Sequence, residues 1–315
     1  MGDGQWWAVS LTEAVGNNKP LSVVCEGEEL VLFRNAAGRA FALEDRCPHR
    51  RVPLSPGVLT PGGLQCPYHG WTFDGASGVC REIPNLHADE RVPSRHAARA
   101  FLVAEADGFI HVWRGSGAPT GVLPSAAYRP IGREYSGSAV VNIVHGTYLE
   151  TMLDGPECLL AFPGVTITDF FLGDPRREGE HLVLDRGGVW KGKGIGPAFV
   201  RDHPLVLRTR VPLAGGAIFV ELLTAAEVPL VTIFIASTAN RRGTTSLNWR
   251  GFRHAHHAPG APFAWRLRRT AGRAPFEVLP EVKGKSIAAL RVAPSLELAT
   301  SRMRQGAECR GEHNE

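Results

Sequence analysis

The segment that most constrains this chain is Arg46–Trp71, where two short arms each carry one cysteine and one histidine. The first arm is Cys47-Pro48-His49, and the second, which starts sixteen residues after His49, is Cys66-Pro67-Tyr68-His69. The proline after each cysteine and the glycine after the second histidine favour two rigid loops. The pattern therefore predicts two loops that each present a thiolate and an imidazole, which are ligands for metal ions.

Two kinds of metal centre use two cysteines and two histidines. Zinc accepts this set in a closed tetrahedral site, but zinc-finger spacing pairs Cys with Cys and His with His, whereas each arm here mixes them. Two thiolates on one iron and two imidazoles on the other are the ligands of a Rieske [2Fe–2S] centre. We therefore expect Cys47, His49, Cys66 and His69 to hold a [2Fe–2S] cluster, with zinc as the alternative.

The motif and its surroundings resemble the Rieske domain of oxygenase α chains, a family that includes vanillate and dicamba demethylases. Four further segments match that family: Gln5–Val9, Leu32–Arg34, Phe73–Gly75 and Phe109–Trp113. Respiratory Rieske proteins carry an extra cysteine pair where this chain has Val52 and Tyr68, and a serine where it has Trp71. Because hydroxyl donors to the cluster raise its reduction potential, the resemblance implies a low-potential centre.

Length and composition indicate a soluble globular protein of two domains. The chain has 315 residues, 43% hydrophobic and 21% charged, and a net charge of +4 without a long basic block, so we expect no nucleic-acid partner. The four cysteines outside the arms show no disulfide-framework spacing, which fits a reducing cytosol. No apolar run reaches about 18 residues, so we expect a cytoplasmic protein without a membrane span.

The expected fold class is α+β, with an all-β Rieske [2Fe–2S] domain over residues 1–120. Short apolar runs separated by Gly, Pro and Asn turns predict its strands within residues 21–113. The Gly/Pro-rich segment 115–124 marks the boundary to a domain over residues 121–315. By the resemblance, this second domain is a helix-grip-like antiparallel sheet with a C-terminal helix.

The apolar pattern of the second half predicts its elements individually. Strands are expected at 138–144, 165–171, 181–186, 205–211, 217–223, 230–236 and 244–250, and helices at 147–154, 262–269 and 286–304. The glycine-rich segment Gly192–Gly196 lacks the spacing of a phosphate loop and is predicted to be a hairpin tip.

The resemblance also implies a mononuclear iron site in the second domain, and here the chain departs from the family. That iron binds two histidines and a carboxylate, and its motif Asp-x-x-His-x4-His ends a helix. With Glu150 and Asp154 aligned on this motif, Glu157 and Phe162 stand at the histidine positions, and Phe276 stands at the carboxylate position. Because a phenylalanine ring cannot coordinate a metal, we expect no mononuclear iron.

Asp154 has its own expected role. In the family this aspartate bridges a cluster histidine of one subunit to an iron ligand of the next, and the subunits form rings, usually trimers. Here Asp154 either keeps that inter-subunit relay or caps a helix end, and the sequence leaves both open.

Three hypotheses about function follow. In the first, the chain is the electron-donating subunit, without its own mononuclear iron, of a hetero-oligomeric oxygenase. A catalytic paralogue would share its trimer-like ring. A separate reductase or ferredoxin would supply electrons, because the chain has no flavin or nicotinamide fingerprint. In the second, it is a self-sufficient oxygenase for a small organic substrate, whose altered site combines Glu157 with His145 or the histidines of 254–257. In the third, it is a redox carrier or sensor, for which a second domain of this size is large.

Overall fold

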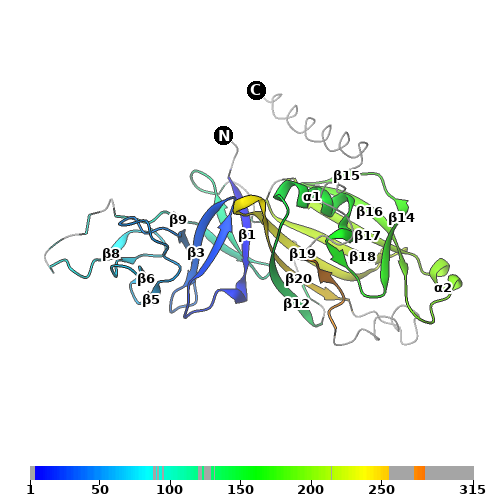
Figure 1. Cartoon of the computed structure of the whole chain (residues 1–315), viewed down its shortest axis with the longest axis horizontal. Coiled ribbons are helices and arrows are strands. Elements are labelled where there is room, and N and C mark those ends of the chain that lie inside the picture. The colour runs from blue at the N-terminus through cyan, green and yellow to red at the C-terminus, as the bar shows by residue number, and fades with distance from the viewer. Residues whose placement is uncertain are drawn as a thin grey trace, which may run out of the picture. The chain divides into compact units, whose positions relative to one another are not determined.

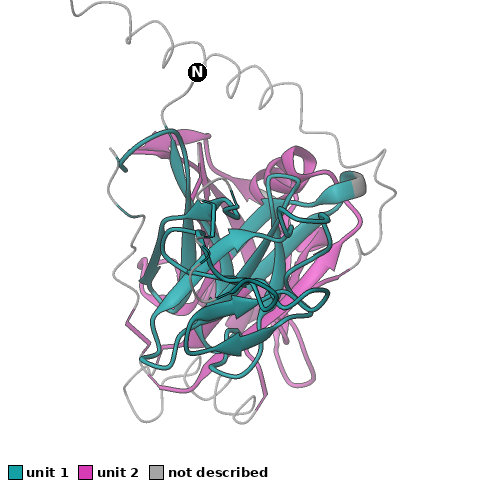
Figure 2. Ribbon diagram, turned by 90° about the vertical axis from the view of Figure 1, so that its left-hand side faces the viewer, with its two compact units in different colours: residues 1–128, 236–248 teal, residues 129–235, 249–315 magenta. Residues whose placement is uncertain are grey.

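The structure, a computed structural model, describes residues 4–87, 90, 92–93, 96–119, 123, 129–130, 132–213, 215–254 and 273–280. The chain forms two compact units, Met1–Tyr128 with Ala236–Asn248, and Arg129–Ile235 with Trp249–Glu315 (Figure 2). These units differ from the expected division at residue 120, because residues 236–248 lie in the first unit, and the division by function stays a prediction. The α+β fold class is confirmed, with a β-rich first unit and an antiparallel sheet in the second. The helices expected at 262–269 and 286–304 lie outside the described residues.

Three antiparallel sheets build the first unit, in the orders β1-β11-β10, β2-β3-β4-β9 and β5-β6-β7-β8 (Figure 1). Their bounds are Gln5–Leu11 (β1), Leu21–Cys25 (β2), Glu28–Arg34 (β3), Ala40–Glu44 (β4), Val58–Thr60 (β5), Gly63–Gln65 (β6), Thr72–Phe73 (β7), Cys80–Glu82 (β8), Ala100–Phe101 (β9), Val103–Ala106 (β10) and Phe109–Arg114 (β11). The strands expected within 21–113 are therefore confirmed, and β1 is an additional strand.

Strand β3 explains why its sequence is apolar at successive positions. Side chains alternate between the two faces of a strand. Leu30 and Leu32 enter one apolar core, while Val31 and Phe33 enter the other. Both faces are thus buried, and the second core also contains the expected ligands Cys47 and Cys66. The cluster arms are consequently anchored in the interior of the unit.

The second unit is organised by an eight-stranded antiparallel sheet in the order β12-β20-β19-β18-β17-β16-β14, with β15 also paired to β16. The bounds are Glu134–Val141 (β12), Val165–Leu172 (β14), Arg176–Glu178 (β15), His181–Trp190 (β16), Leu205–Pro212 (β17), Ala217–Thr224 (β18), Pro229–Ala239 (β19) and Thr245–Arg253 (β20). Each strand expected in this half corresponds to one of these. A separate two-stranded sheet pairs β13 (Leu160–Ala161) with β21 (Glu277–Val278).

The helix expected at 147–154 is confirmed as α1 (His145–Asp154), which packs against β16 and β17 (Figure 1). Its buried face consists of Tyr148, Thr151, Met152 and Leu153, at helical spacing. The helix ends at Asp154 because Gly155 and Pro156 follow, and proline lacks the N–H that an interior helical position needs. The chain end of α1 thereby places Asp154 and Glu157 close in sequence at one helix terminus.

The prediction for Gly192–Gly196 is wrong. This segment joins β16 to a short helix, α2 (Pro197–Asp202), instead of turning between two strands. Proline at the first turn of a helix is favourable because its missing N–H has no helical partner to lose.

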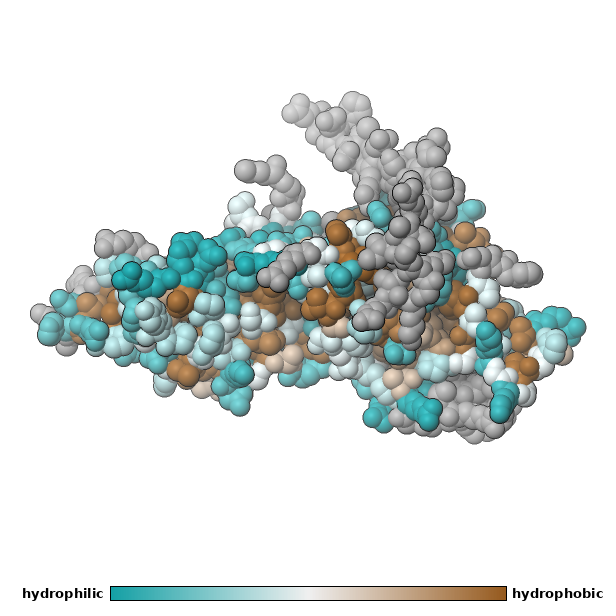
Figure 3. All heavy atoms as spheres, viewed as in Figure 1, coloured by the Kyte–Doolittle hydropathy of each residue, from teal (hydrophilic) through white to brown (hydrophobic). Residues whose placement is uncertain are grey.

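The visible face of the molecule mixes hydrophilic and hydrophobic residues (Figure 3). Large hydrophobic side chains exposed on the surface include Val58, Tyr68, Leu102, Val140, Val144, Phe171, Leu172 and Val228. Within the described part of the chain, no helix is both long and apolar enough to cross a membrane.

Candidate functional site

Two loops of the first unit carry the four expected cluster ligands, and their backbones follow the same pattern. Residues 47–52 lie between β4 and β5, and residues 66–71 lie between β6 and β7. The bonds that close the loops run from Cys47 N–H to the Val52 carbonyl and from Cys66 N–H to the Trp71 carbonyl, both at 2.8 Å. Local backbone hydrogen bonds therefore give each arm its own fixed shape.

The fifth residue of each loop takes a left-handed backbone conformation. Arg51 has φ of 58° and Gly70 has φ of 71°. The N–H of Arg51 donates to the Cys47 carbonyl (2.8 Å), and the N–H of Gly70 donates to the Cys66 carbonyl (3.2 Å). A Cβ atom on Gly70 would lie 2.9 Å from Cγ of Pro84. Glycine is thus required in the second loop by both conformation and space.

The four ligand side chains gather as a nitrogen pair and a sulfur pair. The Nδ1 atoms of His49 and His69 are 3.0 Å apart, so one ion can bind both. The side chains of Cys47 and Cys66 are 2% and 3% exposed and are in hydrogen-bonding contact. Each pair draws one residue from each loop. Two facing imidazoles and two facing thiols are the donor set that the two irons of a Rieske cluster take, so these residues fit the group.

Electrostatics prepare these donors for a cation. Burial, followed by the neighbouring Cys66 side chain, raises the pKa of the Cys47 thiol, while the N–H groups of His49 and Arg50 donate to its sulfur and act to lower that pKa. Desolvation, followed by the charges of His69, Arg50 and His96, lowers the pKa of His49, which favours the neutral imidazole that metals bind. A bound cation can therefore displace the thiol protons at little cost from the imidazoles.

Aromatic side chains fix the planes of both ligand imidazoles. The Trp71 ring stacks on His49 with centroids 4.5 Å apart and planes at 4°, and His96 meets the edge of Trp71 at 4.9 Å. The Tyr68 ring stacks on His69 at 3.9 Å and is itself 62% exposed. The histidine side of the centre therefore reaches the solvent, while the cysteine side is buried.

Asp45, which the sequence did not single out, holds the first loop to the sheet. Its carboxylate is 5% exposed and accepts the N–H groups of Leu54 and Ser55, each at 2.7 Å, and the hydroxyl of Ser22 at 3.1 Å. Three donors to one buried carboxylate tie both ends of the ligand loop to β2. Its place two residues before Cys47 was the available signal.

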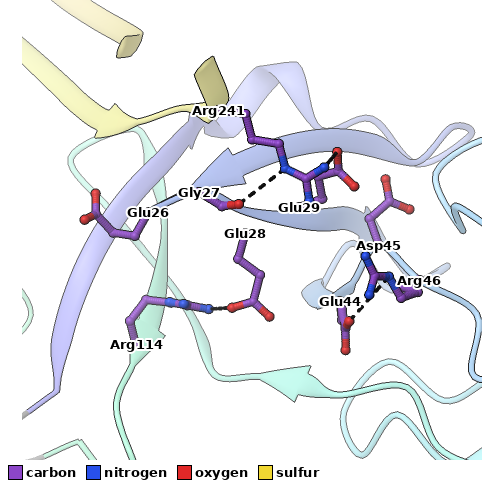
Figure 4. A pocket seen from close by; sticks show the side chains of 9 residues that line it. All are labelled: Glu26, Gly27, Glu28, Glu29, Glu44, Asp45, Arg46, Arg114 and Arg241. Atoms are coloured by element: carbon purple, nitrogen blue, oxygen red, sulfur yellow. Dashed lines mark hydrogen bonds and ion pairs between the residues drawn. The ribbon is translucent and has the colours of Figure 1, made fainter. Parts of the chain in front are cut away.

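A polar pocket of about 410 Å³ lies beside Asp45 (Figure 4). It is lined by Glu26, Gly27, Glu28, Glu29, Glu44, Asp45, Arg46, Arg114 and Arg241. Arg241 pairs with Glu29 (2.7 Å), and Arg114 pairs with Glu28. Because these cations answer the carboxylates of β3, we interpret the pocket as an ion-pair network that supports the strand.

The second expected site looks different. Asp154 pairs with Arg186 of β16, whose Nη2 lies 2.5 Å from Oδ1 and also donates to the Asp154 backbone carbonyl. The helix-cap interpretation of Asp154 needs its own side chain to accept from a helix N-terminus, but Asp154 is the last residue of α1, so that interpretation is wrong. The inter-subunit relay stays a prediction.

The two phenylalanines at the degenerate positions lie opposite each other. Within the β13–β21 ladder, Leu160 faces Val278 and Ala161 faces Glu277, so Phe162 and Phe276 flank its end at matching positions. They are 5% and 3% exposed. The ring of Phe276 presses against β20, where a Cβ on Gly251 would lie 2.5 Å from its Cε1. The structure thus brings these positions together and fills them with apolar rings.

The residues suggested for an altered iron site are not brought together as a set of ligands. His145 begins α1, the Nε2 of His254 lies 2.8 Å from the hydroxyl of Thr232, and His256 and His257 lie outside the described residues. Oε2 of Glu157 is buried without a hydrogen-bond partner. Among the residues that the structure describes, no group of three or more His, Cys, Asp and Glu could hold a metal ion.

Comparison with known proteins agrees with the cluster site. Residues 5–101 match the Rieske [2Fe-2S] domain. The chain is 36% identical to protein TIC 55, chloroplastic, of Arabidopsis thaliana over 227 residues, which are 67% of this chain and 41% of that protein. It is also 36% identical to the oxygenase component of dicamba O-demethylase of Stenotrophomonas maltophilia over 184 residues, which are 57% and 52% of the two chains. The alignments thus span about half, or less, of these relatives.

Solved structures extend the likeness of fold to both units. A crystal structure of dicamba monooxygenase superposes with a TM-score of 0.60 at 22% identity, covering 99% of this chain and 90% of that one. The protein therefore has the fold of a Rieske oxygenase α subunit and contains a Rieske [2Fe–2S] domain. With the sequence relatives above, the chain belongs to the Rieske oxygenase family.

Proposed function

We propose that this chain is the electron-donating subunit of a hetero-oligomeric Rieske oxygenase and lacks a mononuclear iron of its own. The observation that carries this proposal is the contrast between the two sites. Cys47, His49, Cys66 and His69 form a complete donor set. The positions expected to ligate the second iron instead contain buried phenylalanine rings and an aspartate paired with arginine.

The work of the chain's own residues follows from the first site. Bound there, a [2Fe–2S] cluster supplies one-electron redox chemistry. Cys47 and Cys66 hold the buried side, and the stacked His49 and His69 form the exposed side, where a partner protein approaches. On this proposal, a reductase or ferredoxin supplies electrons, and a catalytic paralogue in the same trimer-like ring provides the oxygen-activating iron.

The alternative is a self-sufficient oxygenase with an altered metal site. The observation in its favour is Glu157, whose buried Oε2 has no hydrogen-bond partner and is free to bind a cation. Its missing histidines would have to come from a neighbouring segment.

Iron content separates the two. Under the proposal, purified protein holds about two irons and two acid-labile sulfides per chain, and Glu157→Ala leaves both values unchanged. The exposed Glu150→Ala on α1 serves as a matched control. A wild type with about three irons, reduced to about two by Glu157→Ala but not by Glu150→Ala, would overturn the proposal.

A gain-of-site experiment tests the same contrast from the other direction. The triple variant Glu157→His, Phe162→His and Phe276→Asp restores the family's ligand types, and we expect it to be less stable than wild type because two buried rings are lost. We expect a third iron only when Phe276→Asp is included. The wild-type chain alone should not couple oxygen consumption to product, whereas a mixture with the catalytic paralogue should.

A further inference from the structure

The most deeply buried cation described in the second unit lies at the end of α1. Arg186 stands in β16 with its side chain only 5% exposed, and its guanidinium meets the 17%-exposed carboxylate of Asp154 at 2.5 Å. The same guanidinium donates to the backbone carbonyl of Asp154. A guanidinium cannot lose its charge in a protein, so its burial requires negative groups around it.

Three negative features surround this position. The first is the Asp154 carboxylate, and the second is the carboxyl end of α1, where unpaired carbonyls carry the negative end of the helix dipole. The third is Glu157, three residues further on, whose Oε2 is buried without a hydrogen-bond partner. Two carboxylates and a helix terminus are an environment that demands a cation.

The neighbouring charges of the sheet belong to a different network. Asp185 precedes Arg186 in β16, so its side chain points to the opposite face of the strand. Asp185 pairs with Arg208 at 2.8 Å and with Arg176 at 3.2 Å, and Arg208 also pairs with Glu227 at 3.0 Å. Arg208, 13% exposed, is therefore a matched buried cation whose partners are not Asp154 or Glu157.

We propose that the Arg186 guanidinium replaces, as a permanent and redox-inert cation, the positive charge of the mononuclear iron in this subunit. The inference rests on the proposed function and deepens it, since it names the residue that makes the iron dispensable. Phe162 and Phe276 occupy space, but apolar rings cannot neutralise Asp154 and Glu157. Arg186 does so, fixes the end of α1, and leaves no vacancy for a divalent ion.

The proposal predicts that removal of the guanidinium creates a demand for another cation. Arg186→Ala should lower the melting temperature by roughly 6–20 °C, because the loss of one partner leaves buried charge without compensation. Co²⁺ should then recover about half of that loss or more, since a ligand that binds the folded state stabilises it. Arg186→Lys, which keeps the charge, should melt closer to wild type and gain little from Co²⁺.

Matched measurements make the test decisive. Co²⁺ should leave wild type and Arg208→Ala unshifted, and the visible spectrum of bound Co²⁺ should be seen with Arg186→Ala alone. Equal shifts in Arg186→Ala and Arg208→Ala, or an Arg186→Ala variant that melts with wild type, would overturn the inference. If Arg186→Ala does not fold, Asp154→Asn measures the same pair. It should be destabilised, and adding Arg186→Met should restore part of the loss. Failure of that restoration also counts against the inference.

The outcome is separable from the proposed function. Two irons in wild type without any cation rescue in Arg186→Ala would leave the electron-donating role intact and remove the assignment of Arg186. Three irons in wild type would remove the proposed function itself.

Discussion

The left-handed position of the two cluster loops provides a sharp quantitative prediction. Gly70→Ala and Arg51→Gly exchange residue types at equivalent places, where φ is 71° and 58°. Alanine at position 70 must adopt a conformation that costs an L-residue about 1–2 kcal/mol. Its Cβ also meets Cγ of Pro84 at 2.9 Å, and overpacking adds about 1–3 kcal/mol. We therefore expect Gly70→Ala to lose roughly 2–5 kcal/mol of unfolding free energy.

Arg51→Gly should behave in the opposite way. It releases the same backbone strain of about 1–2 kcal/mol, against an entropic cost for glycine of about 0.5–1 kcal/mol. The exposed Arg51 side chain gives up little packing. The net change should therefore stay within about 1 kcal/mol of wild type, although the substitution lies four residues from Cys47.

Thermal unfolding of the iron-loaded protein, followed by circular dichroism and visible absorbance, measures both. At about 2–4 °C per kcal/mol, Gly70→Ala should melt roughly 4–20 °C below wild type. Gly38→Ala is the control, since Gly38 has φ of 79° with nothing within 4 Å of its added Cβ, so it reports the backbone strain without the clash. The reasoning is refuted if Gly70→Ala loses no more than Gly38→Ala, or if Arg51→Gly falls as far as Gly70→Ala.

Cys47→Ser and His69→Ala should each abolish the two-iron, two-sulfide content and the rhombic spectrum of the reduced protein, and one stoichiometric zinc in a colourless wild type would contradict the cluster assignment. By protein-film voltammetry, the reduction potential should lie toward the lower end of about −150 to +300 mV, and a value near the top would show an unrecognised hydroxyl donor. Burial lowers the pKa of His111 from 6.5 to about 4, so the unfolded chain binds a proton that the folded chain refuses between these values. Stability should thus fall by about 3 kcal/mol as pH drops from 6.5 to 4, and His111→Leu should flatten this slope in denaturant titrations at several pH values. Gly251→Ala should cost about 1–3 kcal/mol through its contact with Phe276, and Phe276→Leu should relieve part of that loss; an unchanged melting temperature would argue against the contact.

The sequence predicted those features that short-range patterns encode. The mixed Cys/His arms identified the cluster ligands because spacing within a tight loop decides which donors meet. Strands such as β2 and β17 were recognisable from apolar runs between turn residues, and the end of α1 from Gly155 and Pro156. The same alignment placed Phe162 and Phe276, distant in sequence, at one site, and the ladder between β13 and β21 now joins them.

Other features depend on tertiary contacts that no local pattern reveals. Arg186 reads in the sequence as an ordinary charged residue of a strand, and only the packing of α1 on β16 shows that it meets Asp154. Asp45 likewise gains its importance from amide groups nine and ten residues away. The turn at Gly192–Gly196 was misjudged because glycine spacing reports a turn but does not report whether a strand or a helix follows.

The arrangement of the donors has a mechanical consequence. Because the nitrogen pair and the sulfur pair each take one member from residues 47–52 and one from residues 66–71, a bound cluster cross-links the two loops twice. Among the described residues every cysteine is free, so no disulfide performs this task. A cross-link that closes a loop of about 15–20 residues contributes about 3 kcal/mol in the chain-entropy description. The iron centre is therefore also the staple of its own domain, and agents that strip iron should loosen the two loops as a reductant loosens a disulfide-bonded protein.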